Sequence, residues 1–267
     1  MNPKNELTNA INRVVENINR ALALSVLTDE FKSHDLGRTV SNLRGKGYSV
    51  LDEIDRQKVT EDLMDQLEIR NTPELSISLE EVHLKEIIQY LIRLDMIHEI
   101  AERSDQSNTA TYRLGVSQPG LRYAQADALA EAMLRDHKFG ELPLAEQNVI
   151  LERVRNEIKG RMMEDIILLE TKLANPKKEV FAFYFDIGEF DMVVFDPATA
   201  SCAIYEIKHS AERDARQYRH LTDEEKCKAT EFRFGTITGK YVIYRGEDCE
   251  ENGIQYRNVE EYLKSLT

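Results

Sequence analysis

Two carboxylates and one ammonium group, those of Asp191, Glu206 and Lys208, fall close together in the sequence. Charged groups at the edge of buried strands are costly unless they are paired with each other or bound to a metal. Carboxylate oxygens are the ligands that hard divalent cations prefer, and an amine beside such an ion suits the hydrolysis of a phosphodiester. The alternative is a structural ion pair on a strand.

Two predicted strands would position these three side chains. Residues 191 to 195 and 202 to 207 are rich in β-branched and aromatic residues, and residues 197 to 201 between them have turn composition. Asp191 opens the first strand of this hairpin. Glu206 and Lys208 are two positions apart at the end of the second strand and therefore share a face.

A long helix is predicted over residues 145 to 174. Its apolar residues fall in two strips, so we expect it to be covered on two sides. The first strip contains Val154, Ile158, Met162, Ile166, Leu169 and Leu173, and the second contains Gly160, Met163, Ile167 and Thr171. Glu164 lies beside the second strip and is the candidate acid of this helix. If the helix is rotated from this orientation, Glu170 is the candidate instead. The simpler alternative for Glu164 is that it is an ordinary exposed helix acid beside Arg161 and Lys172.

Together these segments resemble the PD-(D/E)xK nuclease-like superfamily. The resemblance is carried by the stretches 160 to 164 (GRMME), 188 to 191 (GEFD) and 206 to 208 (EIK). More narrowly, residues 120 to 267 are similar to the C-terminal domain of many bacterial and archaeal AAA-type ATPases. The closing segment is part of that similarity: a strand at 240 to 247, a glycine turn at 253 and 254, and a helix at 259 to 264.

This resemblance implies roles for the candidate residues. Glu164, Asp191 and Glu206 would bind Mg²⁺ or Mn²⁺, and Lys208 would orient or activate the attacking water. Phe190 stands where the name of the superfamily has proline, a position that is loosely kept. A complete set of acids and lysine does not prove activity, because many relatives of the ATPase type have no demonstrated substrate.

The overall composition is that of a folded protein. The chain has 267 residues, is 42% hydrophobic and contains only 12 glycines and 6 prolines, which is enough chain for two domains. It has neither an apolar run of the ~18 residues that span a bilayer nor a signal-peptide core near its N-terminus. We therefore expect a soluble, cytoplasmic protein without a membrane partner.

Net charge argues against avid binding of nucleic acid. The formal charge is −13, whereas proteins that bind DNA through bulk charge are basic. One cluster opposes this trend and ends at His220, and its candidates for contacting nucleic acid are Arg213, Arg216, Gln217 and Arg219. Their spacing places the arginines on one side of a predicted helix next to the candidate metal site. The alternative is a solvated face whose arginines pair with neighbouring acids.

The N-terminal half has a different pattern. Helices are predicted over residues 3 to 27 and 50 to 68, and a third helix starts from a capping box at Ser78 and Glu81 and continues to Leu94. Strands at 96 to 100 and 111 to 114 follow, with a polar tip between them. This order resembles a winged helix, which in the ATPases of the resemblance commonly precedes the nuclease-like domain.

The last helix of a winged helix often reads DNA. Its exposed residues here are of mixed charge rather than a basic stripe, which favours a packing or protein-contact role: Lys85, Glu86, Gln89, Tyr90 and Arg93. A phosphate-binding motif of the type GxxxxGK[ST] does not occur, so we expect no ATPase activity from this chain. An AAA-type ATPase partner or self-association is the implied alternative to DNA.

The sequence thus predicts an α/β (α+β overall) protein in three segments. Residues 1 to 48 are helical, residues 49 to 118 form a winged-helix-like domain, and residues 119 to 267 form a restriction-endonuclease-like mixed sheet flanked by helices. The predicted function is Mg²⁺-dependent hydrolysis of DNA. The alternatives are a non-catalytic interaction or effector module of an ATPase and a DNA-binding regulator.

Overall fold

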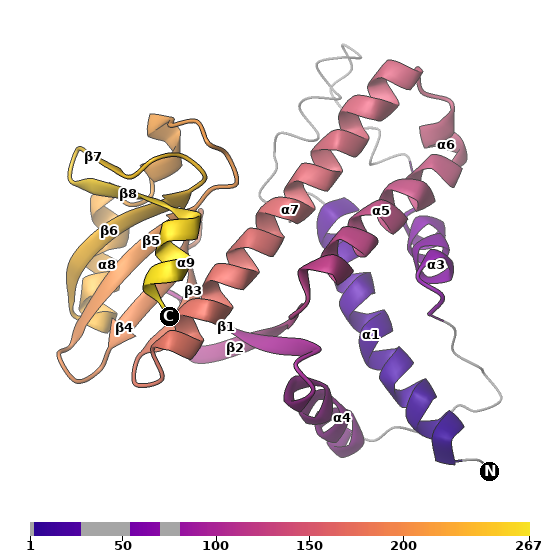
Figure 1. Ribbon diagram of the computed structural model, residues 1–267, viewed down its shortest axis with the longest axis horizontal. Helices are drawn as coiled ribbons and strands as arrows, with labels where there is room; N and C mark the ends of the chain where they lie inside the picture. The colour runs from indigo at the N-terminus through magenta and orange to yellow at the C-terminus, as the bar shows by residue number, and fades with distance from the viewer. Residues whose placement is uncertain (1–2, 28–53, 70–80) are drawn as a thin grey trace. The chain divides into compact units, whose positions relative to one another are not determined.

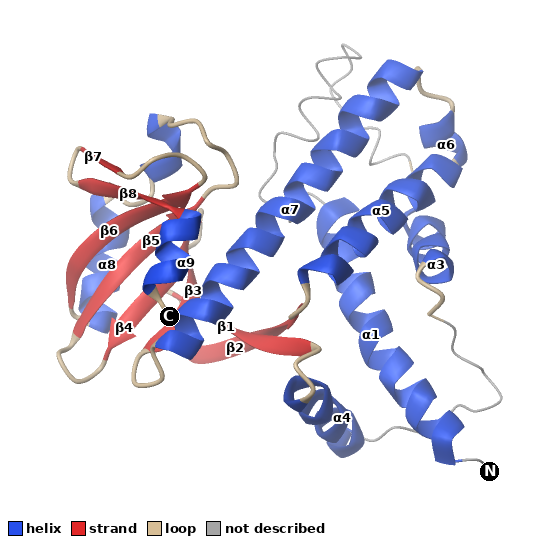
Figure 2. Cartoon of the chain, in the orientation of Figure 1, coloured by secondary structure: helices blue, strands red, loops and turns tan. Residues whose placement is uncertain are grey.

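The computed structural model describes residues 3–27, 54–69 and 81–267, and within these ranges it leaves the side chains of residues 3–6, 25, 81, 215 and 216 undescribed. The described chain is of mixed α/β class, as predicted (Figure 1, Figure 2). Residues 28 to 48 of the predicted helical segment, and Ser78 at the start of the capping box, lie outside the described residues. Within the described ranges, no helix is both long enough and apolar enough to cross a bilayer.

The chain forms two compact units that interleave in the sequence. The first takes in the described parts of Met1–Ile97 together with Val116–Lys159, and the second takes in His98–Gly115 and Gly160–Thr267. The chain therefore passes into the second unit, returns to the first near residue 116, and passes again into the second near residue 160. The candidate site belongs to the second unit.

The first unit is helical. Its elements are α1 (Pro3–Leu27), α3 (Arg56–Gln66), α4 (Glu81–Arg93), α5 (Pro119–Arg135), α6 (His137–Gly140) and the beginning of α7 (Leu144–Ala174). Asp55 accepts a hydrogen bond from the backbone N–H of Lys58, which satisfies a free donor at the start of α3. Helix α3 packs on α5 and α1 around the buried side chains of Val59, Leu63 and Leu129.

The second unit is built on one eight-stranded mixed sheet with the strand order β2-β1-β3-β4-β5-β6-β8-β7. The strands are β1 (Ile97–Ser104), β2 (Ser107–Val116), β3 (Glu179–Tyr184), β4 (Glu189–Asp196), β5 (Ser201–Ile207), β6 (Thr236–Tyr244), β7 (Cys249–Glu251) and β8 (Ile254–Asn258). Strand β4 pairs antiparallel with both β3 and β5, whereas β5 and β6 run parallel. The predicted hairpin of residues 191 to 207 is confirmed.

Helices cover both faces of this sheet (Figure 1). On one face, Phe234 of α8 (Glu224–Phe234) and Leu221, which precedes this helix, join a core that contains Phe181, Phe190 and other residues of the central strands. On the other face, the core combines residues of α7, of the sheet and of α9 (Val259–Ser265). The near-complete burial of the central strands explains why they are apolar on both sides.

Helix α7 uses its two apolar strips in succession. Val154 and Ile158 of the first strip are buried in the core of the first unit, and Met163 and Ile167 of the second strip are buried against the sheet. We expected both strips to be buried along the whole helix, but the first strip is buried only in the first part. The change from one strip to the other coincides with the boundary between the units. Its last member, Leu173, is 65% exposed.

The strands predicted at 96 to 100 and 111 to 114 are present as β1 and β2, but they are longer than predicted and their turn is shorter. Strand β1 pairs in parallel with β3, so the hairpin extends the large sheet. The compact units therefore differ from the expected boundaries at 48/49 and 118/119: the hairpin groups with the C-terminal strands, and α5 groups with α3. Parallel pairing between distant segments leaves no local signal in the sequence.

Candidate functional site

The structure brings Asp191, Glu206 and Lys208 together at the ends of β4 and β5. The ammonium of Lys208 donates hydrogen bonds to Glu206 Oε2 at 2.7 Å and to Asp191 Oδ2 at 3.2 Å. Both carboxylates are almost fully buried, whereas the lysine side chain keeps 28% of its surface exposed. Two buried acids thus share one cation that reaches the solvent.

Backbone hydrogen bonds hold this arrangement in place. Asp191 Oδ2 also accepts from the backbone N–H of Ile207, at 2.7 Å, which ties the acid of β4 to the end of β5. The backbone N–H of Lys208 donates to the carbonyl of Ile243 in β6, at 2.8 Å. The three side chains are therefore fixed by the ladder of the central sheet rather than by a loop.

The electrostatics of the site keep the lysine charged. Burial by itself would lower the pKa of Lys208, but the carboxylates of Asp191, Glu206 and Glu164 outweigh burial and hold that pKa well above its ordinary value. At neutral pH the Lys208 side chain is therefore an ammonium group that donates hydrogen bonds. It is not a base.

Glu164 rather than Glu170 is the helix acid that faces the site. Glu164 is close enough to Lys208 to raise its pKa, and its side chain is only 15% exposed and lies 3.6 Å from Arg161. Glu170, the candidate for a rotated helix, is exposed. Of these two helix acids, Glu164 is thus the one whose charge acts on Lys208.

A buried ion network next to Glu164 was not predicted. Arg113 of β2 contacts Asp165 Oδ1 at 2.6 Å and Glu102 Oε1 of β1 at 2.9 Å. Asp165 follows Glu164 directly and is 2% exposed, so its pairing fixes the rotation of α7 at this point. The only sequence signal was a charge inside the helix beside the apolar residue Ile166, and its partners lie far away in the sequence.

The basic cluster is arranged differently from the prediction. Only a short 3-10 helix, η3 (Ala215–Tyr218), forms where a longer helix carrying three arginines was expected. Gln217 binds inward, donating to Ser210 Oγ and the Glu212 carbonyl, and it also accepts from the backbone N–H of Asp214. Such local hydrogen bonds compete with a regular helix. Gln217 therefore braces the loop through these hydrogen bonds.

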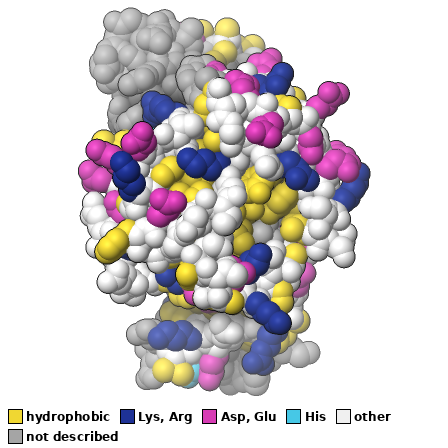
Figure 3. Space-filling view, turned by 90° about the vertical axis from the view of Figure 1, so that its left-hand side faces the viewer, with side chains coloured by type: hydrophobic (Ala, Val, Ile, Leu, Met, Phe, Trp, Pro, Cys, Tyr) yellow, Lys and Arg dark blue, Asp and Glu magenta, His cyan; other side chains and the backbone are white. Residues whose placement is uncertain are grey.

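Two of the three arginines of this cluster, Arg213 and Arg219, have described side chains. Arg213 is exposed and lies 3.1 Å from Cys249 Sγ, and Arg219 is also exposed. The side chain of Arg216 lies outside the described residues. On the face shown in Figure 3, basic and acidic side chains are interspersed and form no continuous basic area.

Two further titratable side chains lie near the site: His220, which the sequence placed in the basic cluster, and Lys226, which was not a candidate. His220 and Lys226 lie 2.7 Å apart, from the ring Nδ1 to the ammonium nitrogen. Burial, and then Lys226, Arg219 and Lys208, lower the pKa of His220, whereas Asp191 raises it. The imidazole is therefore neutral at neutral pH and lies within the electrostatic reach of the site.

The fit of these residues to a divalent cation is partial. Among the side chains that the structure describes, no group of three or more His, Cys, Asp or Glu residues is arranged as a metal site. Asp191 and Glu206 nonetheless fit a hard cation in the chemistry of their oxygens and in that they already share one positive charge. Glu164 of α7 is the third acid that acts on the charge of Lys208.

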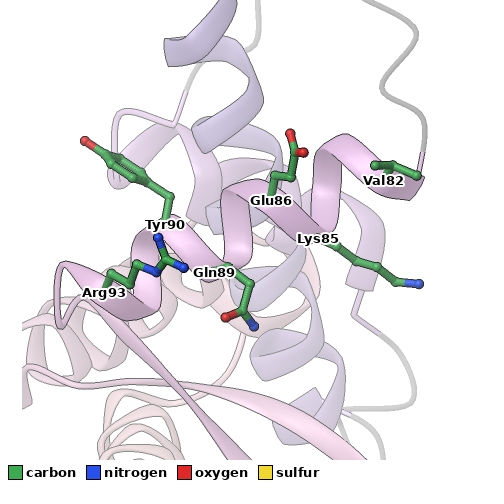
Figure 4. Close-up of a pocket in the computed structure, with 6 residues that line it drawn as sticks. All are labelled: Val82, Lys85, Glu86, Gln89, Tyr90 and Arg93. Atoms are coloured by element: carbon green, nitrogen blue, oxygen red, sulfur yellow. The ribbon is translucent and has the colours of Figure 1, made fainter.

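The face of α4 that was considered for DNA reading lines an open depression (Figure 4). Its lining residues are Val82, Lys85, Glu86, Gln89, Tyr90 and Arg93. Two of these side chains are basic and one is acidic, so the mixed character inferred from the sequence holds for the surface.

Comparisons of the chain with protein-family models, with curated proteins and with solved structures gave no match. The site therefore has to be interpreted from its own geometry.

Proposed function

We propose that this protein is a divalent-cation-dependent, nuclease-like hydrolase that cleaves phosphodiester bonds in DNA. The observation that carries the proposal is the sharing of the Lys208 ammonium by two buried carboxylates on adjacent strands, with Glu164 beside them. A helix acid, a strand acid and an ExK strand occur in the order that the resemblance implies. The proposal includes a PD-(D/E)xK-like fold for the second unit and a winged-helix origin for residues 49 to 118.

In this proposal, Asp191, Glu206 and Glu164 hold Mg²⁺ or Mn²⁺. Such an ion, when bound, stabilises the charge that develops on a phosphate and lowers the pKa of a water. Lys208 acts as a donor: its ammonium orients the attacking water or contacts a phosphate oxygen, since its raised pKa prevents it from accepting a proton. The partly exposed ammonium marks the side from which substrate approaches.

The direct test is cleavage of supercoiled plasmid and of single-stranded DNA with Mg²⁺ or Mn²⁺. We expect the wild-type protein to cut at least one of these substrates and the Asp191→Asn and Lys208→Met variants to lose at least ~10²-fold of the rate, as for an interaction made in the transition state. A matched control is Lys228→Met, which removes an exposed lysine paired with Glu224. Equal cleavage by all four proteins would reject catalysis at this site.

A second candidate is a non-catalytic interaction module that works with an AAA-type ATPase partner or by self-association. It is favoured by the absence, within the described ranges, of a preformed group of three metal-ligating side chains. In that case the Asp191–Lys208–Glu206 cluster is a structural ion network. The module predicts that Asp191→Asn changes stability without a parallel effect on any cleavage, and that no divalent ion binds.

DNA reading through α4 is the weaker form of the binding hypothesis, because its exposed face carries mixed charges. A gel-shift series over increasing salt tests it, since phosphate contacts weaken steeply with ionic strength. Salt-sensitive binding that survives Asp191→Asn but is lost in Arg93→Glu would favour this function over hydrolysis.

A further inference from the structure

A histidine and a lysine form a hydrogen-bonded pair near the proposed site and have no role in the account above. His220 precedes α8, and Lys226 lies in the first part of that helix. Their side-chain nitrogens are 2.7 Å apart. An ammonium group can only donate, so Nδ1 of His220 is the acceptor and the proton of the neutral ring is on Nε2. His220 therefore offers an N–H donor at Nε2, the ring nitrogen that does not accept from Lys226.

The position of this donor is set by a glycine at the start of β4. A Cβ on Gly188 would lie 2.7 Å from His220 Cε1 and 2.9 Å from both His220 Nε2 and the ammonium of Lys226. Gly188 has a φ of 82°, which other residues seldom adopt, so a side chain is excluded there for two reasons. The Nε2 edge of the imidazole thus lies against the turn that leads directly into the strand of Asp191.

The charges that act on His220 are mainly positive. Lys226, Arg219 and Lys208 lower the pKa of this histidine, and Asp191 raises it. Lys226 lies over the ring of Phe185 at 5.3 Å, and the carboxylates that act on its charge are those of Asp223, Glu206 and Asp105. An N–H donor on His220, in mainly positive surroundings next to a carboxylate site, matches a singly charged phosphodiester anion.

We propose that His220 Nε2–H binds a non-bridging oxygen of a DNA phosphate next to the one that is cleaved. This inference rests on the proposed function and deepens it, because it names the group that holds the strand across the site. His220 contacts the phosphate, and Lys226 is the positioning residue that fixes the tautomer of His220 by its hydrogen bond to Nδ1. Neither residue takes part in bond cleavage.

The test is a side-chain ¹⁵N NMR titration of the full chain with a short single-stranded oligonucleotide, measured with EDTA and again with Ca²⁺. The matched probe is the same sequence with a neutral methylphosphonate backbone. We expect the free protein to show His220 as the Nε2–H tautomer, and the phosphodiester oligonucleotide to shift its Nε2 resonance. The methylphosphonate should leave it unchanged. His137, which is 81% exposed and pairs with Glu141, is an internal reference in the same spectra.

Variants separate binding from a purely structural role. We expect His220→Phe to weaken the phosphodiester oligonucleotide by roughly tenfold to a hundredfold, the effect of one hydrogen bond to a charged group. Lys226→Met should weaken it and also remove the tautomer preference of His220, and Lys226→Arg should restore both. Lys228→Met, on the same helix, is the control and should change neither.

The result that overturns the inference is an unshifted His220 resonance with the phosphodiester in both conditions, or equal shifts with both backbones. Failure of the proposed function is distinguishable, because binding is read without cleavage. If Asp191→Asn abolishes cleavage but His220→Phe and Lys226→Met leave oligonucleotide affinity unchanged, hydrolysis stands and the phosphate contact is rejected. If nothing cleaves but the shift occurs, the contact stands alone.

Discussion

At the scale of single residues, the site depends on mutual compensation. A buried carboxylate is unfavourable by several kcal/mol unless it is paired, and here Asp191 and Glu206 are paired through one ammonium. The loss of any member leaves a buried charge on the others. The three side chains therefore form one energetic unit, and a variant at one position changes the protonation and position of its partners.

Asp191→Ala should strongly destabilise the fold. It removes a partner of Lys208 and the acceptor of the Ile207 N–H, so we expect a loss of about 3–5 kcal/mol in the free energy of unfolding. Asp191→Asn keeps an acceptor oxygen and should lose clearly less. Urea unfolding of the two variants measures the difference. Equal losses would mean that the backbone hydrogen bond contributes nothing.

The stability of the fold should depend on His220 in mild acid. Because burial and the cations Lys226, Arg219 and Lys208 lower its pKa, the unfolded chain binds a proton at His220 before the folded chain does. The neutral His220 contributes fully to the free energy of unfolding above the ordinary histidine pKa of about 6.5. This contribution is lost as the pH falls from there through the lowered pKa of His220 in the folded state. His220→Gln should therefore lose less stability than wild type between about pH 7.5 and about pH 5.

The measurement for His220 is the free energy of unfolding at both pH values. His137→Gln is the control, since that side chain is exposed, and it should behave as wild type. An identical acid loss in His220→Gln and wild type would show that this histidine does not titrate as argued.

The sequence revealed the residues whose neighbours are local. Glu206 and Lys208 share a strand, Asp191 is on the adjoining strand, and helical spacing chose Glu164 over Glu170. The residues that were missed have partners across long separations: Arg113 with Asp165, and Gly188 with His220. Such contacts exist only after the sheet and its helices have assembled.

At the scale of elements, α7 is a single helix that serves two cores. In its first part, the side chains of Val154 and Ile158 are buried in the core of the first unit. In its second part, Met163 and Ile167 are buried against the sheet. The pairing of Asp165 with Arg113 sets the rotation of the second part and so directs Glu164 to the site. The sequence showed both strips of α7 but not where one replaces the other, because burial depends on the partner.

Substitutions along α7 should separate the two cores. Ile158→Ala and Ile167→Ala each leave a cavity and should cost about 2–5 kcal/mol, whereas Leu173→Ala at a 65% exposed position should change stability by no more than about 0.5 kcal/mol. Hydrogen exchange locates the effects. Ile158→Ala should reduce protection in α3 and α5, and Ile167→Ala in β4 and β6.

Because the two units interleave in the sequence, one hydrogen-exchange result would contradict this prediction. If Ile158→Ala and Ile167→Ala both reduce protection equally throughout the chain, the helix does not divide its burial between two cores.

The hairpin of β1 and β2 shows why the organisation into two units was not predicted. Its two strands are neighbours in the sequence, but the pairing of β1 with β3 is parallel and joins distant segments. The helix predicted for the basic cluster was wrong for a different reason: Gln217 forms local side-chain hydrogen bonds to the backbone of its loop, and these replace the bonds of a helix.

At the scale of the whole molecule, the net charge of −13 opposes a polyanion. The basic groups near the site, Arg219, Lys226 and Lys208, are few, so the proposed function requires an attraction to DNA that is local rather than general. Binding of DNA should accordingly be weak and supported by few phosphate contacts, and a divalent ion that neutralises the acids should strengthen it. The proposed chemistry therefore depends on whether the acidic pair accepts such an ion.

The most direct test of the central claim is a calorimetric titration of the full chain with Mn²⁺ and with Mg²⁺. The account predicts saturable binding to wild type, its loss in Glu206→Gln, and tighter binding in Lys208→Met, because that variant removes the ammonium that competes for the same carboxylates. Lys228→Met should bind as wild type. If wild type takes up no ion, or if Glu206→Gln binds as well as wild type, Asp191 and Glu206 are a structural ion network and the proposed centre does not exist.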